Sequence, residues 1–166
     1  MKKIFLLFAI SLFSFQFSFS QGNRKIPSVI LDDVDGNKVD ISQLSKDGKI
    51  IVLDFWATWC VPCKKELTNI VDLYPDWQKN YNMELVAISI DDSRNTAKVK
   101  PTVDGSLWPY LVLLDPNSDV KRALGFQNVP FVIVLDQQGN IAYQHSGYVE
   151  GDEFELEDQL KTLAAK

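Results

Sequence analysis

The fold of this chain is decided by residues 54–64, which read Asp54-Phe55-Trp56-Ala57-Thr58-Trp59-Cys60-Val61-Pro62-Cys63-Lys64. This stretch contains the only two cysteines among 166 residues, three positions apart and directly after an apolar run. Two thiols at this spacing can close a small disulfide and reopen it, which predicts redox exchange. A disulfide kept only for stability is a weaker alternative, because so short a ring gains about 2 kcal/mol of chain entropy. No metal site is expected, since zinc needs a fuller ligand set than two cysteines and one distant histidine.

The N-terminus has the pattern of a secretion signal. Two lysines precede the apolar stretch 4–13, and Ser18-Phe19-Ser20 offers small residues for a cleavage site before Gln21. The apolar stretch is shorter than the roughly 20 residues that span a bilayer, so we expect cleavage near Ser20 rather than a membrane anchor. The predicted division is a signal peptide over residues 1–20 and a single domain over residues 21–166, exported to the periplasm.

The charge of the predicted mature chain narrows its partners. Without residues 1–20 it carries 15 Lys and Arg against 22 Asp and Glu, a net charge of −7. Such a surface argues against nucleic acid, whose binding needs a basic footprint. Export also matters for the cysteines, because disulfides persist outside the cytoplasm. A Cys-X-X-Cys pair that acts there as a reductant needs an external source of electrons.

Apolar patterning predicts an α/β domain. Residues 49–56 and 83–90 are apolar at successive positions, as in strands covered on both faces. A helix over about 62–80, which Pro75 kinks or ends, joins them and makes them parallel. The other expected elements are a hairpin from 29–34 and 38–41, a polar helix over 92–104, a strand over 110–114, a helix over 118–124 capped by Ser118, strands over 131–135 and 141–145, and a helix over 152–163 whose Phe154, Leu156, Leu160 and Leu163 face the sheet. Together they predict a central mixed sheet with helices on both faces.

The two thiols are expected to have different roles. Cys60 follows a buried strand and opens a helix, where free backbone N–H groups and the helix dipole lower the pKa of a thiol. Only the thiolate attacks a disulfide. Cys63 lies one turn further on, placed to resolve the mixed disulfide, and Pro62 suits the first turn of the helix.

Other residues are candidates for proton transfer and substrate binding. Asp54 lies inside an apolar strand, where burial raises the pKa of a carboxyl and makes it a plausible proton carrier for Cys63. Val129-Pro130 precedes another apolar strand, and a cis proline there would leave backbone groups free for an extended substrate. The candidate substrate-binding residues are Trp59, Val61, Pro62, Val129 and Pro130. We interpret Asp91-Asp92 as a polar loop, His145 as a solvated strand residue and the acidic run 150–158 as a helix start with a solvated face.

With residues 54–64 and Val129-Pro130 in view, the chain resembles the thioredoxin superfamily over residues 27–164. The predicted signal, the early hairpin and an extra segment at about 93–125 are similar to the TlpA/ResA-like branch of exported thiol–disulfide oxidoreductases. The resemblance implies a thioredoxin fold with an added N-terminal hairpin, Cys60 as exposed nucleophile, Cys63 as resolving thiol and a cis bond at Pro130. Asp54 matches the buried acid of thioredoxins, and Ala87 stands where their partner lysine would be. Asp92 matches a buried acid that ResA-like proteins place in this loop.

The expected function is that of an exported thiol–disulfide oxidoreductase that reduces disulfides of exported proteins. It needs no cofactor beyond the redox-active Cys60–Cys63 disulfide. The predicted compartment and the resemblance imply a membrane thiol reductase as electron donor, and we expect the protein to be a monomer. A net oxidant or isomerase is the alternative within the same chemistry. A peroxidase is a weaker one, because peroxide-reducing thiols usually lie in another local motif. The alternative of a different class is a non-catalytic binding module with a thioredoxin fold.

Overall fold

The computed structural model describes residues 24–166, so the predicted signal peptide lies outside the described residues. Within this range seven strands form one sheet in the order β2-β1-β5-β4-β3-β6-β7. The strands are β1 (Ile30–Asp33), β2 (Lys38–Asp40), β3 (Ile50–Trp56), β4 (Met83–Ser89), β5 (Leu111–Leu114), β6 (Phe131–Leu135) and β7 (Ile141–Ser146). The helices are η1 (Ile41–Gln43), α1 (Val61–Ile70), α2 (Tyr74–Tyr81), η2 (Thr96–Lys98), α3 (Val99–Ser106), α4 (Asp119–Leu124) and α5 (Asp152–Ala164). No helix in this range is long and apolar enough to cross a membrane.

The sheet is mixed, as the sequence predicts. β3, β4 and β5 run parallel, while β6 is antiparallel to β3 and β7 is antiparallel to β6. The β1–β2 hairpin is added to the β5 edge, with β1 antiparallel to β5. All seven residues of β3 are buried, as expected for a strand covered on both faces. The predicted thioredoxin-like fold with an added hairpin is confirmed.

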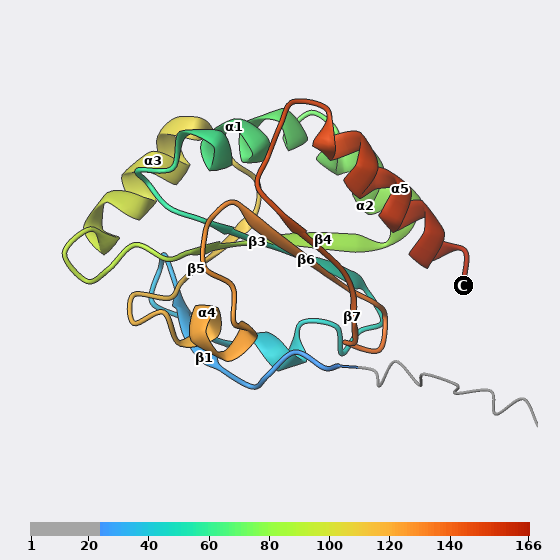
Figure 1. Ribbon diagram of the computed structural model, residues 1–166, viewed down its shortest axis with the longest axis horizontal. Coiled ribbons are helices and arrows are strands. Elements are labelled where there is room, and N and C mark those ends of the chain that lie inside the picture. Colours follow the sequence, from blue (N-terminus) through green and yellow to red (C-terminus); the bar gives the residue numbers. More distant parts are fainter. Residues whose placement is uncertain (1–23) are drawn as a thin grey trace, which may run out of the picture.

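Helices cover both faces of the sheet unequally (Figure 1). Helices α1, α2, α3 and α5 supply one apolar core, whose helical members include Leu67, Trp77, Val103 and Leu160. On the opposite face α4 and η1 supply a second core, to which Ile41, Val120 and Leu124 belong. Neighbouring residues of β3 divide between them: Val52 and Trp56 lie in the first core, while Leu53 and Phe55 lie in the second. The face that α1 covers is the one that contains both cysteines.

The predicted helix over 62–80 is two helices. Helix α1 ends at Ile70, and α2 begins at Tyr74 with Pro75 in its first turn. Proline has no N–H for the carbonyl four residues earlier and disfavours helical backbone in the residue before it. Pro75 therefore separates the segments and starts the second one. The helix predicted over 92–104 also has different bounds in the structure: it begins at Thr96 with η2 and continues as α3 through Gly105 to Ser106.

Two side-chain predictions were wrong. Phe154 is 59% exposed, and the buried residues of α5 are Glu153, Leu156, Leu160 and Leu163. Because each helical residue turns about 100°, Phe154 lies on nearly the opposite side from Leu156.

Ser118 makes no capping hydrogen bond at the start of α4. Asp115 takes that role, because its carboxylate accepts the backbone N–H groups of Asp119 at 2.6 Å, Val120 at 3.1 Å and Lys121 at 3.2 Å.

Candidate active site

The Cys-X-X-Cys pair lies where β3 passes into α1. A turn closed by the Cys60 N–H on the Ala57 carbonyl at 3.0 Å joins the two elements. Cys60 is the N-cap of α1, and its sulfur accepts the Cys63 N–H at 3.3 Å. The two cysteines are joined by a disulfide, with Cα atoms 5.4 Å apart. The sequence position after a buried strand and at a helix start is thus confirmed.

Access to the two sulfurs differs. The resemblance implied an exposed nucleophile, but Cys60 is only 4% exposed in the disulfide form, and Cys63 is fully buried. The exposed surface around them comes from Trp59 at 64% and Val61 at 71%. A partner therefore meets an apolar rim first and can reach Cys60 before Cys63.

Pro130 lies at the same end of the sheet as the thiols. In the β3–β6 register Phe55 pairs with Phe131, so Pro130 comes next to the end of β3 that leads into the turn. The Val129–Pro130 bond is cis, as the resemblance implied. The Pro130 carbonyl accepts the Gly147 N–H at 2.9 Å. The substrate-binding role of this segment stays a prediction.

Asp54 is buried on the face that α1 covers. It is 0% exposed, and its register partners Ala87 and Val132 both belong to the core that contains Cys60 and Cys63. Neither carboxyl oxygen has a hydrogen-bond partner among the described residues. Burial raises the pKa of Asp54 well above its ordinary value, as the sequence predicts. Ala87 directly opposite supplies no cation to offset that burial.

A second buried acid, Glu66 on α1, was missed from the sequence. Glu66 is 3% exposed, and its Oε2 atom has no partner among the described residues. Burial raises the pKa of Glu66 strongly, and the negative charges of Asp54, Asp152 and Glu153 raise it further. Asp54 and Glu66 thus form one interacting acid pair, which can hold a proton near neutral pH more readily than either ordinary carboxyl.

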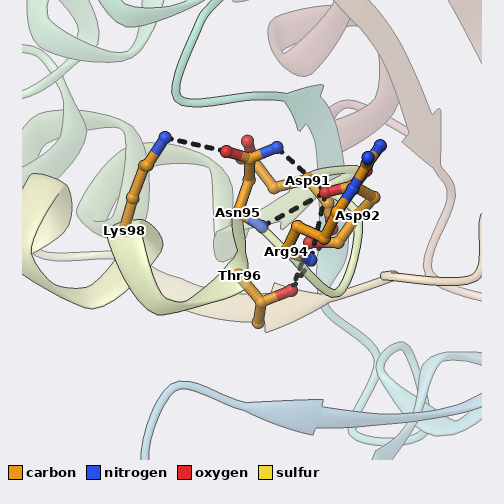
Figure 2. A network of polar contacts seen from close by, with 6 residues as sticks. All are labelled: Asp91, Asp92, Arg94, Asn95, Thr96 and Lys98. Carbon is orange, nitrogen blue, oxygen red and sulfur yellow. Dashed lines mark hydrogen bonds and ion pairs between the residues drawn. The ribbon is translucent and has the colours of Figure 1, made fainter.

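In the loop after β4 the buried acid is Asp91, whereas the resemblance implied Asp92. Figure 2 shows Asp92 holding its own turn: its carboxylate accepts hydrogen bonds from the backbone and guanidinium of Arg94 and from Asn95. The side chain of Asp92 is 42% exposed, and the hydrogen bonds from Arg94 lower its pKa. Asp92 is therefore no buried proton carrier.

Asp91 is the buried acid of this loop, which corrects its interpretation as plain polar loop. It is 2% exposed, and its Oδ2 atom accepts the Thr58 N–H at 2.8 Å and the Ser89 hydroxyl at 2.9 Å. Its Oδ1 atom accepts the Thr58 hydroxyl at 2.7 Å. Asp91 thereby fixes the turn that presents Trp59 and Cys60. Residues 24–166 contain no group of three or more His, Cys, Asp or Glu side chains arranged to hold a metal ion.

Comparison with known proteins identifies the family of this chain. The family model described as AhpC/TSA family matches residues 23–144. The chain belongs to this family. It is 29% identical over 143 residues to the thiol-disulfide oxidoreductase ResA of Bacillus anthracis, covering 86% of this chain and 79% of the relative. It is 30% identical over 124 residues to ResA of Bacillus subtilis, covering 75% of this chain and 66% of the relative.

Solved structures agree in fold. An uncharacterized thioredoxin-like protein from Porphyromonas gingivalis is 41% identical with a TM-score of 0.75, over 86% of this chain and 95% of that one. A putative thiol:disulfide interchange protein DsbE from Chlorobium tepidum is 26% identical with a TM-score of 0.75, over 86% and 96%. With its intact Cys60–Cys63 pair, this member of the AhpC/TSA family is a thiol–disulfide oxidoreductase of the ResA/DsbE type.

Proposed function

We propose that this protein is an exported oxidoreductase that reduces disulfides of other exported proteins through Cys60 and Cys63. The observation that carries the proposal is a disulfide pair at the N-terminus of α1, with Cys60 as N-cap, above a buried acid. In the reduced state the helix N-terminus stabilises a Cys60 thiolate. The apolar rim of Trp59, Val61 and Pro62, with Val129-Pro130 beside it, would hold an extended segment of the partner.

The reaction transfers two electrons in two exchanges. The Cys60 thiolate attacks one sulfur of the partner disulfide, which forms a mixed disulfide and releases the other partner sulfur as a thiolate. Cys63 then gives its proton to an ionised carboxyl of the Asp54–Glu66 pair, which must first have released its own proton, and attacks the Cys60 sulfur. This closes the Cys60–Cys63 disulfide and releases the second partner thiolate. The partner is reduced, the pair is oxidised, and one proton remains on the buried acids.

The return to the dithiol form requires electrons from outside. Since disulfides persist outside the cytoplasm, we propose a membrane thiol reductase as donor, with no cofactor beyond the cysteine pair. The signal-like segment 1–20 supports export, with a mature domain over residues 21–166 that works as a monomer in the periplasm. N-terminal sequencing of the protein recovered from a periplasmic fraction should find Gln21 first.

Turnover with insulin tests the activity. The purified protein should reduce insulin disulfides in the presence of dithiothreitol, Cys60→Ser should abolish this, and Cys63→Ser should accumulate a mixed disulfide with its substrate. Activity that survives Cys60→Ser would falsify the assignment of the nucleophile. Recovery of the mixed disulfide from cells that express Cys63→Ser would name the partner.

The reduction potential decides the direction of electron flow. A value near thioredoxin's, about −270 mV, fits a reductase, whereas a value near about −120 mV fits a net oxidant. Equilibration of the Cys60–Cys63 pair with glutathione or dithiothreitol, read by thiol alkylation, measures it.

A further inference from the structure

The buried acid pair needs a way to exchange its proton with solvent. Each turnover of the proposed reaction leaves one proton on Asp54 or Glu66, and both side chains are buried. The proton must leave before the pair can accept another. This need for proton release rests on the proposed function.

The register of the sheet links Asp54 to another titratable side chain in one direction. In register across three neighbouring strands lie Asp54 on β3, Val132 on β6 and His145 on β7. Register partners share a face of the sheet, so His145 lies on the α1 side, two strand spacings or about 10 Å from Asp54. In the other direction the row continues through Ala87 and Val112, which are apolar and buried. The row itself therefore has no titratable side chain on that side; Tyr110, one residue before β5, is buried and donates its hydroxyl to the Leu67 carbonyl at 2.9 Å.

A small cavity lies between Glu66 and His145. It is lined by Glu66, Val132, Tyr143, His145, Asp152 and Leu156, and its volume of about 10 Å³ is close to the room that one water molecule needs. At its inner end is Glu66, whose Oε2 atom lacks a partner among the described residues and which is 3% exposed. The cavity therefore begins at an unsatisfied buried acid.

The outer end of the cavity reaches solvent at a contact between His145 and Asp152. His145 Nε2 lies 3.3 Å from Asp152 Oδ2, and their side chains are 30% and 20% exposed. The Tyr143 ring stacks on the imidazole with an interplanar angle of 7°, and the Val149 N–H holds the Asp152 carboxylate at 2.8 Å. His145 is thus oriented from both sides, between a buried acid and bulk water.

We propose that His145, held by Asp152, is the solvent end of a proton pathway that serves the Asp54–Glu66 pair. The proton passes from Glu66 across the cavity to the imidazole, which releases one to solvent; no electrons move in this step. His145 acts on the reaction through Glu66 and touches neither sulfur nor substrate.

The charged and titratable groups around this path come from β3, β7, α5 and the loop between β7 and α5, where Tyr148 donates to Glu153 at 2.9 Å. Asp54 on β3 and Asp152 and Glu153 on α5 raise the pKa of Glu66 through their negative charge, after the larger effect of burial. Tyr143 on β7 donates to Glu155 at 2.9 Å, and its pKa is raised to about 12 by burial first. Of the residues that line the cavity in the described part of the chain, only His145 can carry a positive charge. Its imidazole can accept a proton on one ring nitrogen and donate one from the other.

The test is single-turnover oxidation of the reduced protein by excess insulin, in H₂O and in D₂O, from pH 6 to 9. His145→Gln should lower the rate about tenfold, enlarge the solvent isotope effect and make the rate rise with added imidazole. Asp152→Asn, which leaves the imidazole without its anion, should change the rate in the same direction. Gln144→Ala is the matched control, because Gln144 is exposed, lies on the opposite face of β7 and should behave as wild type. The equilibrium with glutathione should stay unchanged, since the pathway alters rates only.

The outcomes separate the two proposals. Wild-type rates and isotope effects in both variants would overturn the pathway while leaving the oxidoreductase function intact. A slow His145→Gln that imidazole does not rescue would also overturn it, because the loss would then be structural. Should His145→Gln fail to fold, Asp152→Asn carries the same readouts. Failure of the wild-type protein itself to react with insulin or dithiothreitol would instead refute the proposed function.

Discussion

At the scale of single residues, Glu66 is the side chain that changes the chemistry of the site. It follows Lys64 and Lys65 in a run that looks solvated. Helical spacing nevertheless places it three residues after Cys63 and four before Ile70, and both of these are fully buried. The same face of α1 therefore carries the resolving thiol and an acid. Glu66 and Asp54 are two carboxyls that cannot easily both ionise, which gives the stability of the protein a specific pH dependence.

Stability should fall as pH rises from about 5 to 9. The pKa of Asp54 and of Glu66 is raised by burial in the folded protein, so the native state keeps protons that the unfolded chain releases above about pH 4. The unfolded state then binds fewer protons, and the free energy of unfolding declines with pH up to the raised pKa values, by at most about 1.4 kcal/mol per pH unit and group. Glu66→Gln should flatten this decline, measured by urea unfolding of the oxidised protein at several pH values.

Asp92→Asn is the control for this pH dependence. The pKa of Asp92 is lowered by its hydrogen bonds from Arg94, so its contribution is present at neutral pH and is lost as pH falls through the folded pKa. The variant should therefore differ from wild type at neutral and alkaline pH by a constant amount. Parallel curves for wild type and Glu66→Gln between pH 5 and 9 would mean that Glu66 is ionised in the folded protein.

At the scale of elements, the turn between β3 and α1 depends on a residue from β4's end. Asp91 holds Thr58 by two hydrogen bonds, to its N–H and its hydroxyl, directly before Trp59 and Cys60. Asp91→Asn would replace one of the two accepting oxygens by an amide NH2 group and should cost about 1–3 kcal/mol while slowing insulin reduction. Asp92→Asn, one residue on and outside these contacts, should leave the turnover rate near wild type. Equal loss of turnover in both variants would contradict the assignment of the turn to Asp91.

The short helix α4 depends on a cap that lies outside it. The Asp115 carboxylate accepts three backbone N–H groups of its first turn, whereas the Ser118 side chain accepts none. Asp115→Ala should cost about 1–2 kcal/mol, the range of a lost N-cap, and Ser118→Ala should cost almost nothing. Thermal or urea unfolding of the two variants compares them directly. A larger effect at Ser118 would show that the serine caps the helix after all.

Sequence patterns predicted the elements better than their side-chain contacts. Continuous apolar runs located β3 and β4, and the change to helical spacing located α1, because burial on one or both faces controls those periods. The hydrogen bonds of Asp115 to the start of α4 and of Asp91 to Thr58 could not be predicted from the sequence. Each joins a loop residue to a segment whose position is known only once the fold is known. The burial of Glu66 was not predicted because a charged residue on a helix is usually exposed to solvent. The row from Asp54 through Val132 to His145 escaped for a simpler reason: strand register brings together three residues that are far apart in sequence.

At the scale of the whole molecule, the first described residues connect the turn between β6 and β7 to the end of α4. Lys25 bridges Asn140, the Ile141 N–H donates to the Arg24 carbonyl at 2.8 Å, and the Arg24 guanidinium donates to the Leu124 carbonyl at 3.2 Å. Ile26 is 6% exposed and belongs to the core on the α4 side. Cleavage before Gln21 would leave this segment on the mature domain, whereas processing a few residues further on would remove it.

Ile26 should therefore contribute more to the free energy of unfolding than its place near the N-terminus suggests. Ile26→Ala removes buried methyl groups beneath α4 and should lower the free energy of unfolding by about 2–5 kcal/mol. Ile30→Ala is the matched control, because Ile30 is 62% exposed and its truncation should change stability by less than about 0.5 kcal/mol. Urea unfolding of the chain that begins at Gln21 measures both. The two variants should keep the Cys60–Cys63 equilibrium of the wild type, since Ile26 packs on the face away from α1; equal and small losses for both would show that the segment merely rests on the domain.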